Sequence, residues 1–548
     1  MIKSDAYRAE HESFVSNGKG TSVGCIMAYI AHVPAFIVLL KLSQGFRKPR
    51  IVRDVAVLVV PTLLSMTVLA EYNYWSLTCI IVLLTIAVNT SQRDSHTDTA
   101  DVGDQGMGYQ NTSYLTLFKG VNVMITCIAI LAVDFRIFPR RFAKTETFGV
   151  SLMDIGVGTF IVSSAMTSRY ARGQPTKPQT QTQTQSQAQS EGLLSRLPLR
   201  ISAQHLAVLM LGVGRFVVLR AINYQEHVSE YGLHWNFFVT LFCVWSAADA
   251  LHAIPRRFLV WIALFWLISY QTLLIATPLT DYILSSTRLN IISANKEGIC
   301  SLMGYIPLYL LSESFSYNIC FNRGRTRSHS REILGTSPKE EEVEEEEVEE
   351  VEEVEEDGAE VAVAALSSSG GDTAEMAEET GGADVDVGVV GVESGGDGSG
   401  ANAFDSRSRV VRWNKLLLQK LSVCSLVLWV AWLAGASVQP TSRRLVNLTY
   451  VALVLAITMS MLLMMYVADT LSYGPTVCVL TLHYFSRHSL VVFLAANLLT
   501  GLVNICFRTI YASRVGALCI LSTYVLLITC AAWAAESLRH FKAAKMRS

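Results

Sequence analysis

A long apolar segment of this chain ends in the charged stretch Ala132-Val-Asp-Phe-Arg-Ile-Phe-Pro-Arg-Arg-Phe-Ala-Lys144. The apolar run covers residues 121–133, and a carboxylate, three arginines and a lysine follow it closely. An ionised group costs about 2.5–3.5 kcal/mol at the centre of a bilayer on insertion scales, and less near the interface. Such a cluster at a membrane boundary is therefore either an orientation signal or a functional site.

The composition indicates a polytopic membrane protein. The chain has 548 residues, of which 51% are hydrophobic and only 16% are charged, whereas soluble domains carry about 25% charged residues. Many long apolar runs add to this signal. The eleven cysteines are scattered and form no C-x-x-C pair, which argues against a zinc site and a disulfide framework. We expect no metal, no cofactor and no nucleic-acid partner.

The apolar runs predict an all-α fold with about thirteen transmembrane helices, since a helix needs roughly 17–25 residues to cross a bilayer. An odd number of spans places the two termini on opposite sides of the membrane. The predicted spans centre on Ala31, Pro61, Val82, Cys127, Thr159, Leu211, Phe242, Leu267, Ile306, Leu426, Leu455, Leu494 and Val525.

Basic residues set the predicted orientation, because cytosolic loops are enriched in lysine and arginine. Basic groups occur after the first, fifth and seventh spans and in the C-terminal tail, and all fall on one side if the N-terminus is lumenal and the C-terminus cytosolic. The loop with Arg136, Arg140, Arg141 and Lys144 then lies on the lumenal side, against the rule. Either a span is miscounted or this cluster has a role other than topology.

Two predicted cytosolic loops are low-complexity sequence. Thr176 to Gln189 is a Gln/Thr/Ser tract, and Glu340 to Asp357 is a Glu/Val tract. Neither has enough apolar surface to fold. The predicted divisions are a lumenal segment (1–21), spans one to five with a charged loop at 134–150 (22–168), a cytosolic Gln/Thr-rich loop (169–203), spans six to nine (204–316), a disordered acidic loop (317–412), spans ten to thirteen (413–535) and a basic cytosolic tail (536–548).

The unusual polar motifs gather on the predicted lumenal side, as expected of a site assembled between helices. Within span twelve, Asn497 and Asn504 are two turns apart on one helix face, where they either bond neighbouring helices or line a polar pocket. Asp154, at the start of span five, can favour the helix N-terminus. The lumenal motifs are His11 to Thr21, the charged loop with Met153-Asp-Ile-Gly-Val-Gly158, Asn223 to Asn236, Ser293 to Gly298, and Arg443-Arg444.

The motif Val133 to Glu146, followed by Met153 to Gly158, resembles the inositol acyltransferases of glycosylphosphatidylinositol (GPI) anchor biosynthesis. Further matching segments are His11 to Thr21, His227 to Asn236, Asn295-Lys-Glu-Gly298 with Gly304-Tyr305, and Leu490 to Asn504. They run in order from about residue 11 to 510, so the resemblance covers nearly the whole chain.

The resemblance implies a thirteen-helix enzyme of the endoplasmic reticulum membrane. Its substrates would be acyl-CoA, with palmitoyl-CoA as the expected donor, and glucosaminyl-phosphatidylinositol among the membrane lipids. It also implies that 134–150 is the catalytic loop, with Asp134 and Lys144 as catalytic residues. Arg136 departs from the family pattern, which has proline there.

The predicted chemistry is direct acyl transfer from a thioester to an inositol hydroxyl. Asp134 is the expected base, and Lys144 is expected to stabilise the oxyanion or hold a substrate phosphate. A plain ion pair that fixes the loop is the structural alternative. The remaining predicted substrate-binding residues are Arg140 and Arg141 (phosphate or interface contacts), His227 (a second acid/base or a structural group), Asn295, Lys296 and Glu297 (the last two pairing to shape the pocket), and Asn497 and Asn504.

Two other function classes stay open at this stage. A polytopic lipid transporter or flippase would also place charges at helix ends, although the sequence shows no clear internal repeat. A non-catalytic subunit of a membrane complex would use the acidic loop as a docking tail. The sequence does not identify protein partners.

Overall fold

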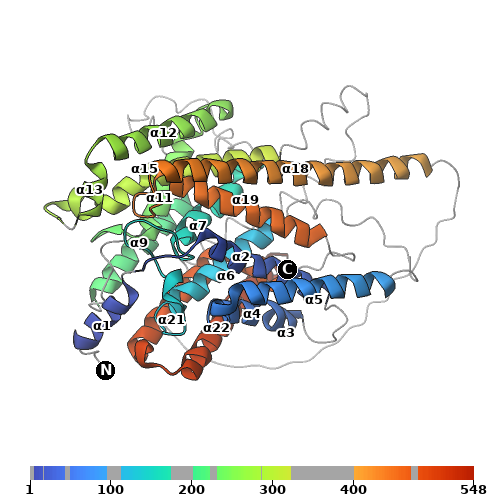
Figure 1. The fold of residues 1–548 in the computed structure, drawn as a ribbon, viewed down its shortest axis with the longest axis horizontal. Helices are drawn as coiled ribbons and strands as arrows, with labels where there is room; N and C mark the ends of the chain where they lie inside the picture. Colours follow the sequence, from blue (N-terminus) through green and yellow to red (C-terminus); the bar gives the residue numbers. More distant parts are fainter. Residues whose placement is uncertain are drawn as a thin grey trace.

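The computed structural model describes residues 5–16, 18–42, 50–94, 113–173, 202–221, 231–285, 287–321, 400–470 and 479–547. These residues form helices joined by irregular segments (Figure 1). Within these ranges the one β-type pairing is a parallel bridge between Gly18 and Thr145. The predicted all-helical architecture is confirmed.

The helices follow one another along the chain with several short turns between the long elements. The first part contains α1 (Asp5–Val15), α2 (Val23–Leu42), α3 (Arg50–Asp54), the π-helical η2 (Val55–Val59), α4 (Val60–Met66), η3 (Ala70–Tyr72), α5 (Asn73–Asp94), α6 (Ser113–Ala132), η5 (Arg140–Phe142), α7 (Asp154–Met166) and α8 (Arg169–Arg172). The middle contains α9 (Ala203–Ala221), α11 (Phe237–Leu251), α12 (Arg256–Ala276), α13 (Leu279–Leu284), α14 (Ile291–Ala294), α15 (Lys296–Ser316) and η7 (Tyr317–Phe321). The last part contains α18 (Gly400–Val438), α19 (Leu448–Thr470), α20 (Leu480–Arg487), α21 (Ser489–Cys506), η8 (Thr509–Tyr511) and α22 (Arg514–Arg547).

Each of the thirteen predicted span centres lies within one of these helices. Seven described helices are long and apolar enough to cross a membrane, and a pair bent by 89°, 51–66 with 70–85, gives an eighth if counted as one span. The helices α7, α9 and α11 are apolar but shorter. The structure therefore supports a polytopic membrane protein with seven or eight candidate spans, while thirteen spans and their orientation stay predictions.

Some element boundaries differ from the predicted divisions. α18 begins at Gly400 rather than at 413, and η7 extends the helical backbone past 316 to Phe321. α22 continues to Arg547, through the segment predicted as a basic tail. Composition marks the apolar core of each span, but a helix can continue into polar sequence that satisfies its own backbone hydrogen bonds.

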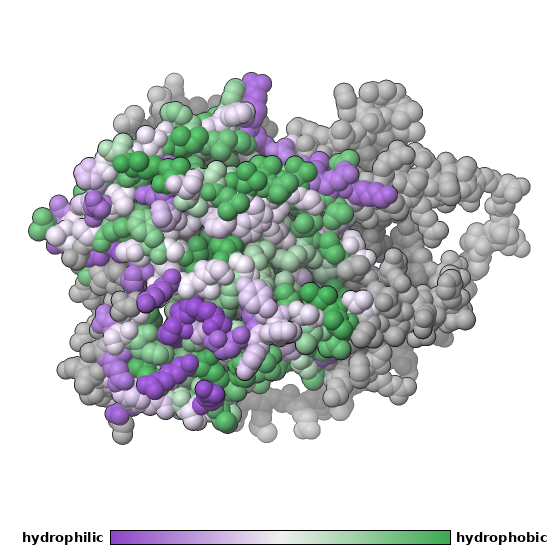
Figure 2. Space-filling view, in the orientation of Figure 1, coloured by the Kyte–Doolittle hydropathy of each residue, from purple (hydrophilic) through white to green (hydrophobic). Residues whose placement is uncertain are grey.

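The helices differ in how much of their surface other helices cover. In α19, 78% of the span is buried, and in α2 and α6 72% is buried, whereas only 17% of α18 is. Figure 1 shows α18 lying along α19 at the edge of the molecule. Apolar side chains of α18, such as Leu426 and Leu433, are exposed, and Figure 2 shows apolar surface over this region. We interpret α19, α2 and α6 as the core and α18 as a lipid-facing helix.

Segments far apart in the sequence meet at one end of the helices, around the loop that follows α6. Thr21 N donates to Val150 O (2.7 Å), and Gly149 N donates to Thr441 O (2.9 Å). Ser442 Oγ donates to Thr147 O (2.5 Å). The N-terminal segment and the loop before α19 therefore pack on the charged loop, as expected from the sequence.

Candidate functional site

Asp134 lies just past the last turn of α6 and is only 6% exposed. Asn504 Nδ2, from the end of α21, donates to Asp134 Oδ2 at 2.8 Å. His11 Nε2, from α1, lies 3.3 Å from Asp134 Oδ1. The structure thus joins two residues that the sequence predicted for the site, Asp134 and Asn504, and adds His11. His11 falls in a motif that matched the family, but nothing in its local sequence points to Asp134.

Arg140 holds the turn that carries Asp134. Its guanidinium donates to the carbonyl oxygens of Val133 (2.6 Å) and Phe138 (3.3 Å). The same group donates to Phe14 O (3.4 Å) and lies 4.1 Å from the centre of the Phe14 ring. Burial lowers the pKa of Arg140 to about 10, although the Asp134 charge opposes this shift. The side chain therefore stays charged at neutral pH and connects the loop to α1.

Arg141 points to a different partner. Its Nη1 lies 2.6 Å from Glu71 Oε1, and its Nη2 donates to Ala70 O at 2.7 Å. These contacts connect the charged loop to η3. Arg136, which departs from the family pattern, is exposed.

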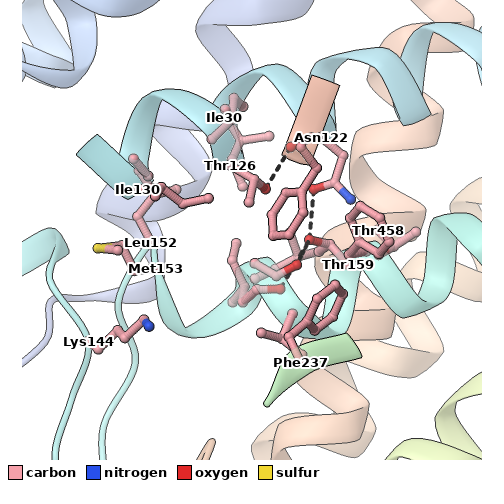
Figure 3. Close-up of a pocket in the computed structure, with 18 of the residues that line it drawn as sticks. Ile30, Asn122, Thr126, Ile130, Lys144, Leu152, Met153, Thr159, Phe237 and Thr458 are labelled. Atoms are coloured by element: carbon pink, nitrogen blue, oxygen red, sulfur yellow. Dashed lines mark hydrogen bonds between the residues drawn. The ribbon is translucent and has the colours of Figure 1, made fainter. Parts of the chain in front are cut away.

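Lys144 lines a cavity of about 220 Å³ between α2, α6, α7, α9, α11, α19 and α21. Figure 3 shows Lys144 at one end, with its nitrogen turned toward the cavity, and Asn122 at the other. The lining residues Asn122 and Ile130 are eight positions apart on α6, so the cavity runs along about 12 Å of this helix. The walls are mostly apolar, and Asn497 also lines the cavity.

The inner end of this cavity carries polar groups from three helices. Thr159 Oγ1 on α7 donates to Asn122 Oδ1 at 2.8 Å (Figure 3). In the part of the chain that the structure describes, Asn122 Nδ2 and Thr458 Oγ1 are buried without a hydrogen-bond partner. The cavity therefore combines a cation at one end, apolar walls and free hydrogen-bonding capacity deep inside.

Asp154 connects the charged loop to the loop before α19. Its Oδ1 accepts from Thr145 N (3.0 Å), its Oδ2 accepts from Thr145 Oγ1 (2.9 Å), and Arg443 Nε lies 2.8 Å from Oδ1. The side chain is 2% exposed. Asp154 therefore does more than favour the start of α7, because it sets the position of the residue next to Lys144.

The predicted binding residues Asn295, Lys296 and Glu297 all have partners within the chain. Asn295 Oδ1 accepts from His234 N (2.8 Å), and Lys296 Nζ donates to Tyr282 O (2.6 Å). These contacts fix the segment between α12 and α15.

Glu297 bonds arginines rather than the neighbouring lysine. Arg288 Nη2 lies 2.7 Å from Glu297 Oε1, and Arg444 Nη2 lies 3.2 Å from the same oxygen. Burial lowers the pKa of Arg444, and the charge of Glu297 opposes the shift. Arg444 Nη1 also donates to Glu146 O (3.2 Å), so this ion cluster connects α15 to the charged loop.

Apart from Arg140 and Arg141, which hold the charged loop, the described predicted residues form three groups. Asp134 and Asn504 meet at α1, Lys144 and Asn497 line the cavity, and Asn295 to Glu297 hold the loops beside them. His227 lies outside the described residues. Within the described ranges, no group of three or more His, Cys, Asp or Glu side chains could hold a metal ion.

Comparison with known proteins adds the family. The profile of the GWT1 family matches residues 7–535, which include every group of the site. The "Phosphatidylinositol-glycan biosynthesis class W protein" of Dictyostelium discoideum is 28% identical over 560 residues, covering 95% of each chain. The "Glucosaminyl-phosphatidylinositol-acyltransferase PIGW" of Bos taurus is 28% identical over 541 residues, covering 94% of this chain and 95% of its own. The "GPI-anchored wall transfer protein 1" of Gibberella zeae is 33% identical over 333 residues, covering 57% of this chain and 66% of its own. The chain belongs to the GWT1 family.

Proposed function

We propose that this protein is the glucosaminyl-phosphatidylinositol acyltransferase of GPI-anchor biosynthesis, as the names of its relatives indicate. It moves a fatty acyl group from acyl-CoA to a hydroxyl of the inositol ring, in the endoplasmic reticulum membrane. The observation that carries this proposal is the family match over residues 7–535, which spans the loop of Asp134 and Lys144 and the helices around the cavity. The family match favours acyl transfer over the lipid-transporter alternative.

The reaction requires a base, an oxyanion-stabilising group and room for an acyl chain. The thioester C–S bond breaks, the ester C–O bond forms, and the hydroxyl proton ends on the thiolate sulfur. Asp134 supplies the carboxylate that draws the proton from the hydroxyl. Lys144, with its ammonium group turned into the cavity, stabilises the negative oxygen of the tetrahedral intermediate.

The cavity beside Lys144 is the proposed place for the acyl chain of the donor. Its walls come from apolar side chains such as Ile125, Phe160 and Phe493, which suit a hydrocarbon chain. Asn497 lies along its wall, while Asn504, two turns further on the same helix, orients Asp134. The acyl carbon would then lie between the cavity and the Asp134 carboxylate.

The basic and polar residues around the loop have a proposed positioning role. Arg140, Arg141 and the cluster of Asn295, Lys296 and Glu297 hold the loops that carry the reacting groups. His227 remains a predicted second acid or base. The proposed topology keeps thirteen spans with a lumenal N-terminus, which places the site on the lumenal side.

The test is acyl transfer by the purified protein from labelled palmitoyl-CoA to glucosaminyl-phosphatidylinositol. Asp134→Asn and Lys144→Ala should each lower kcat by about 10²-fold or more, since acid–base and oxyanion contributions are of this size. Arg136→Ala, at an exposed position of the same loop, is the matched control and should retain activity. Near-normal transfer by well-folded Asp134→Asn and Lys144→Ala proteins would overturn the site assignment, and no transfer by the unaltered protein would overturn the function.

A further inference from the structure

Both oxygens of the Asp134 carboxylate face groups of the protein. Oδ2 accepts from the Asn504 amide at 2.8 Å, and Oδ1 lies 3.3 Å from His11 Nε2. The Asp134 side chain is 9% exposed, whereas the His11 side chain is 25% exposed. A substrate hydroxyl that reaches this place therefore meets the imidazole more readily than the carboxylate.

The His11 nitrogen that faces Asp134 has few other contacts. His11 Nε2 is buried and has no hydrogen-bond partner among the described residues, apart from its approach to Asp134. Distances between catalytic groups are often long before substrate binds and shorten in the reacting complex. A carboxylate beside one imidazole nitrogen favours a proton there, which leaves the other nitrogen free to accept a proton.

We propose that His11 is the general base of the acyl transfer, and that Asp134 orients its imidazole and stabilises the imidazolium that forms. This inference rests on the proposed function and revises one step of it, because His11 takes the hydroxyl proton directly and Asp134 acts through His11. His11 Nδ1 removes the proton of the inositol hydroxyl as the hydroxyl oxygen attacks the thioester carbon. When the tetrahedral intermediate collapses and the C–S bond breaks, the imidazolium returns that proton to the sulfur, which leaves as a thiol. Lys144 stabilises the oxyanion in between.

The N-terminal helix is built to hold His11 at this place. Phe14 O and the Phe14 ring contact Arg140, which also bonds the carbonyl oxygen of Val133 beside Asp134. The Tyr7 hydroxyl lies 3.4 Å from Thr509 Oγ1, and Tyr511 donates to Glu10. α1 therefore contacts both the loop after α6 and the segment after α21.

The charged and titratable groups near the pair are known from these contacts. Arg140 acts on Asp134 through its charge. Tyr7 lies beside His11 in α1, with ring centres 6.1 Å apart, and Arg508 lies 6.0 Å from the Tyr7 ring. Glu10 and Tyr511 are bonded to each other between α1 and the segment after α21. Tyr524 on α22 also interacts with the charge of Asp134.

The experiment measures kcat and KM of the full-length protein with palmitoyl-CoA and glucosaminyl-phosphatidylinositol, with and without added imidazole. His11→Ala should lower kcat by about 10²–10⁴-fold, the usual contribution of a general base, with KM little changed. Added imidazole should restore part of the lost kcat. Ser13→Ala, an exposed change on the same helix, should behave as the unaltered protein.

Tyr7→Phe separates catalysis from docking of α1, because it removes the hydroxyl near Thr509 without altering His11. If His11 served only to dock α1, Tyr7→Phe and His11→Ala should show similar losses of kcat, and imidazole should restore neither. This result would overturn the inference. His11→Ala with near-normal kcat beside an inactive Asp134→Asn would also overturn it, while leaving the proposed function intact. Absence of transfer by the unaltered protein would instead count against the proposed function.

Discussion

Asp154 provides the most direct test of how the loop of Lys144 is held. The change Asp154→Asn keeps the size of the side chain but removes the charge that faces Arg443 at 2.8 Å. The Asp154 side chain is 2% exposed and the Arg443 side chain 12% exposed, so water screens this pair little. One amide oxygen can still accept from Thr145, whose backbone N–H is bonded to Asp154 Oδ1 at 3.0 Å.

The expected loss follows from the arginine that is left behind. Removing one partner of a buried ion pair costs about 3–5 kcal/mol, because the other charge stays buried without compensation. Asparagine keeps part of the hydrogen bonding, so we expect the closed loop to lose about 3 kcal/mol of stability, at the lower end of this range. Since 1.4 kcal/mol is a factor of ten in an equilibrium constant, opening of the loop should become roughly 10²-fold more favourable.

Cleavage by a lysine-specific protease measures this opening at Lys144. When the loop closes faster than it is cut, the rate of cleavage follows the population of the open form. Cleavage of the peptide bond after Lys144 should therefore be about 10²-fold faster in Asp154→Asn. The rate of acyl transfer should fall in the same variant. The double variant Asp154→Asn with Arg443→Met removes both charges, and should recover much of the protection. An unchanged cleavage rate in Asp154→Asn would refute the reasoning. A double variant whose loss of stability equals the sum of the losses in the two single variants would refute it as well.

Three further predictions concern packing, the cavity and the ion cluster. Gly304→Ala should prevent folding, seen as loss of a single size-exclusion peak, because the new Cβ would lie 2.0 Å from Val446 O; Gly501→Ala, with nothing within 4 Å, should give a normal peak. Thr458→Val removes a buried hydroxyl that has no hydrogen-bond partner among the described residues, so the free energy of unfolding should rise by about 1–2 kcal/mol. The KM for palmitoyl-CoA should stay equal or fall, and a raised KM would argue that the cavity holds a polar group instead of a chain. Glu297→Ala should lower the free energy of unfolding by about 3–5 kcal/mol, measured in denaturant, because two arginines lose their carboxylate; an unchanged midpoint would contradict this.

The sequence predicts those features that depend on local pattern. Apolar runs placed each span centre within a helix, and the motifs expected on one face do meet around the loop after α6. The spacing of Asn497 and Asn504 correctly put them on one face of α21, because seven residues are two helical turns. The pattern does not say that one asparagine lines a cavity and the other bonds Asp134, since this depends on which helices pack beside α21.

The features that sequence could not predict depend on partners far away in the chain. Arg140 looks like a phosphate ligand in sequence, but its guanidinium faces carbonyl oxygens of its own turn. Lys296 and Glu297 are neighbours in sequence, yet adjacent residues of a helix point in different directions, and each bonds other groups. His11 is 123 positions from Asp134, and only the docking of α1 brings them together.

The hydrogen bond between Asn504 and Asp134 joins residues that are 370 positions apart in the chain. At a synthesis rate of about 5–20 residues per second, the ribosome makes Asp134 roughly 20–75 s before its partner. During most of this interval the loop lacks both Asn504 and the arginines before α19, because the segments that carry them have not yet been synthesised. A chain that stops before α21 would therefore keep most of its membrane helices and still lack the partner of Asp134, so the site can assemble only after synthesis has passed Asn504.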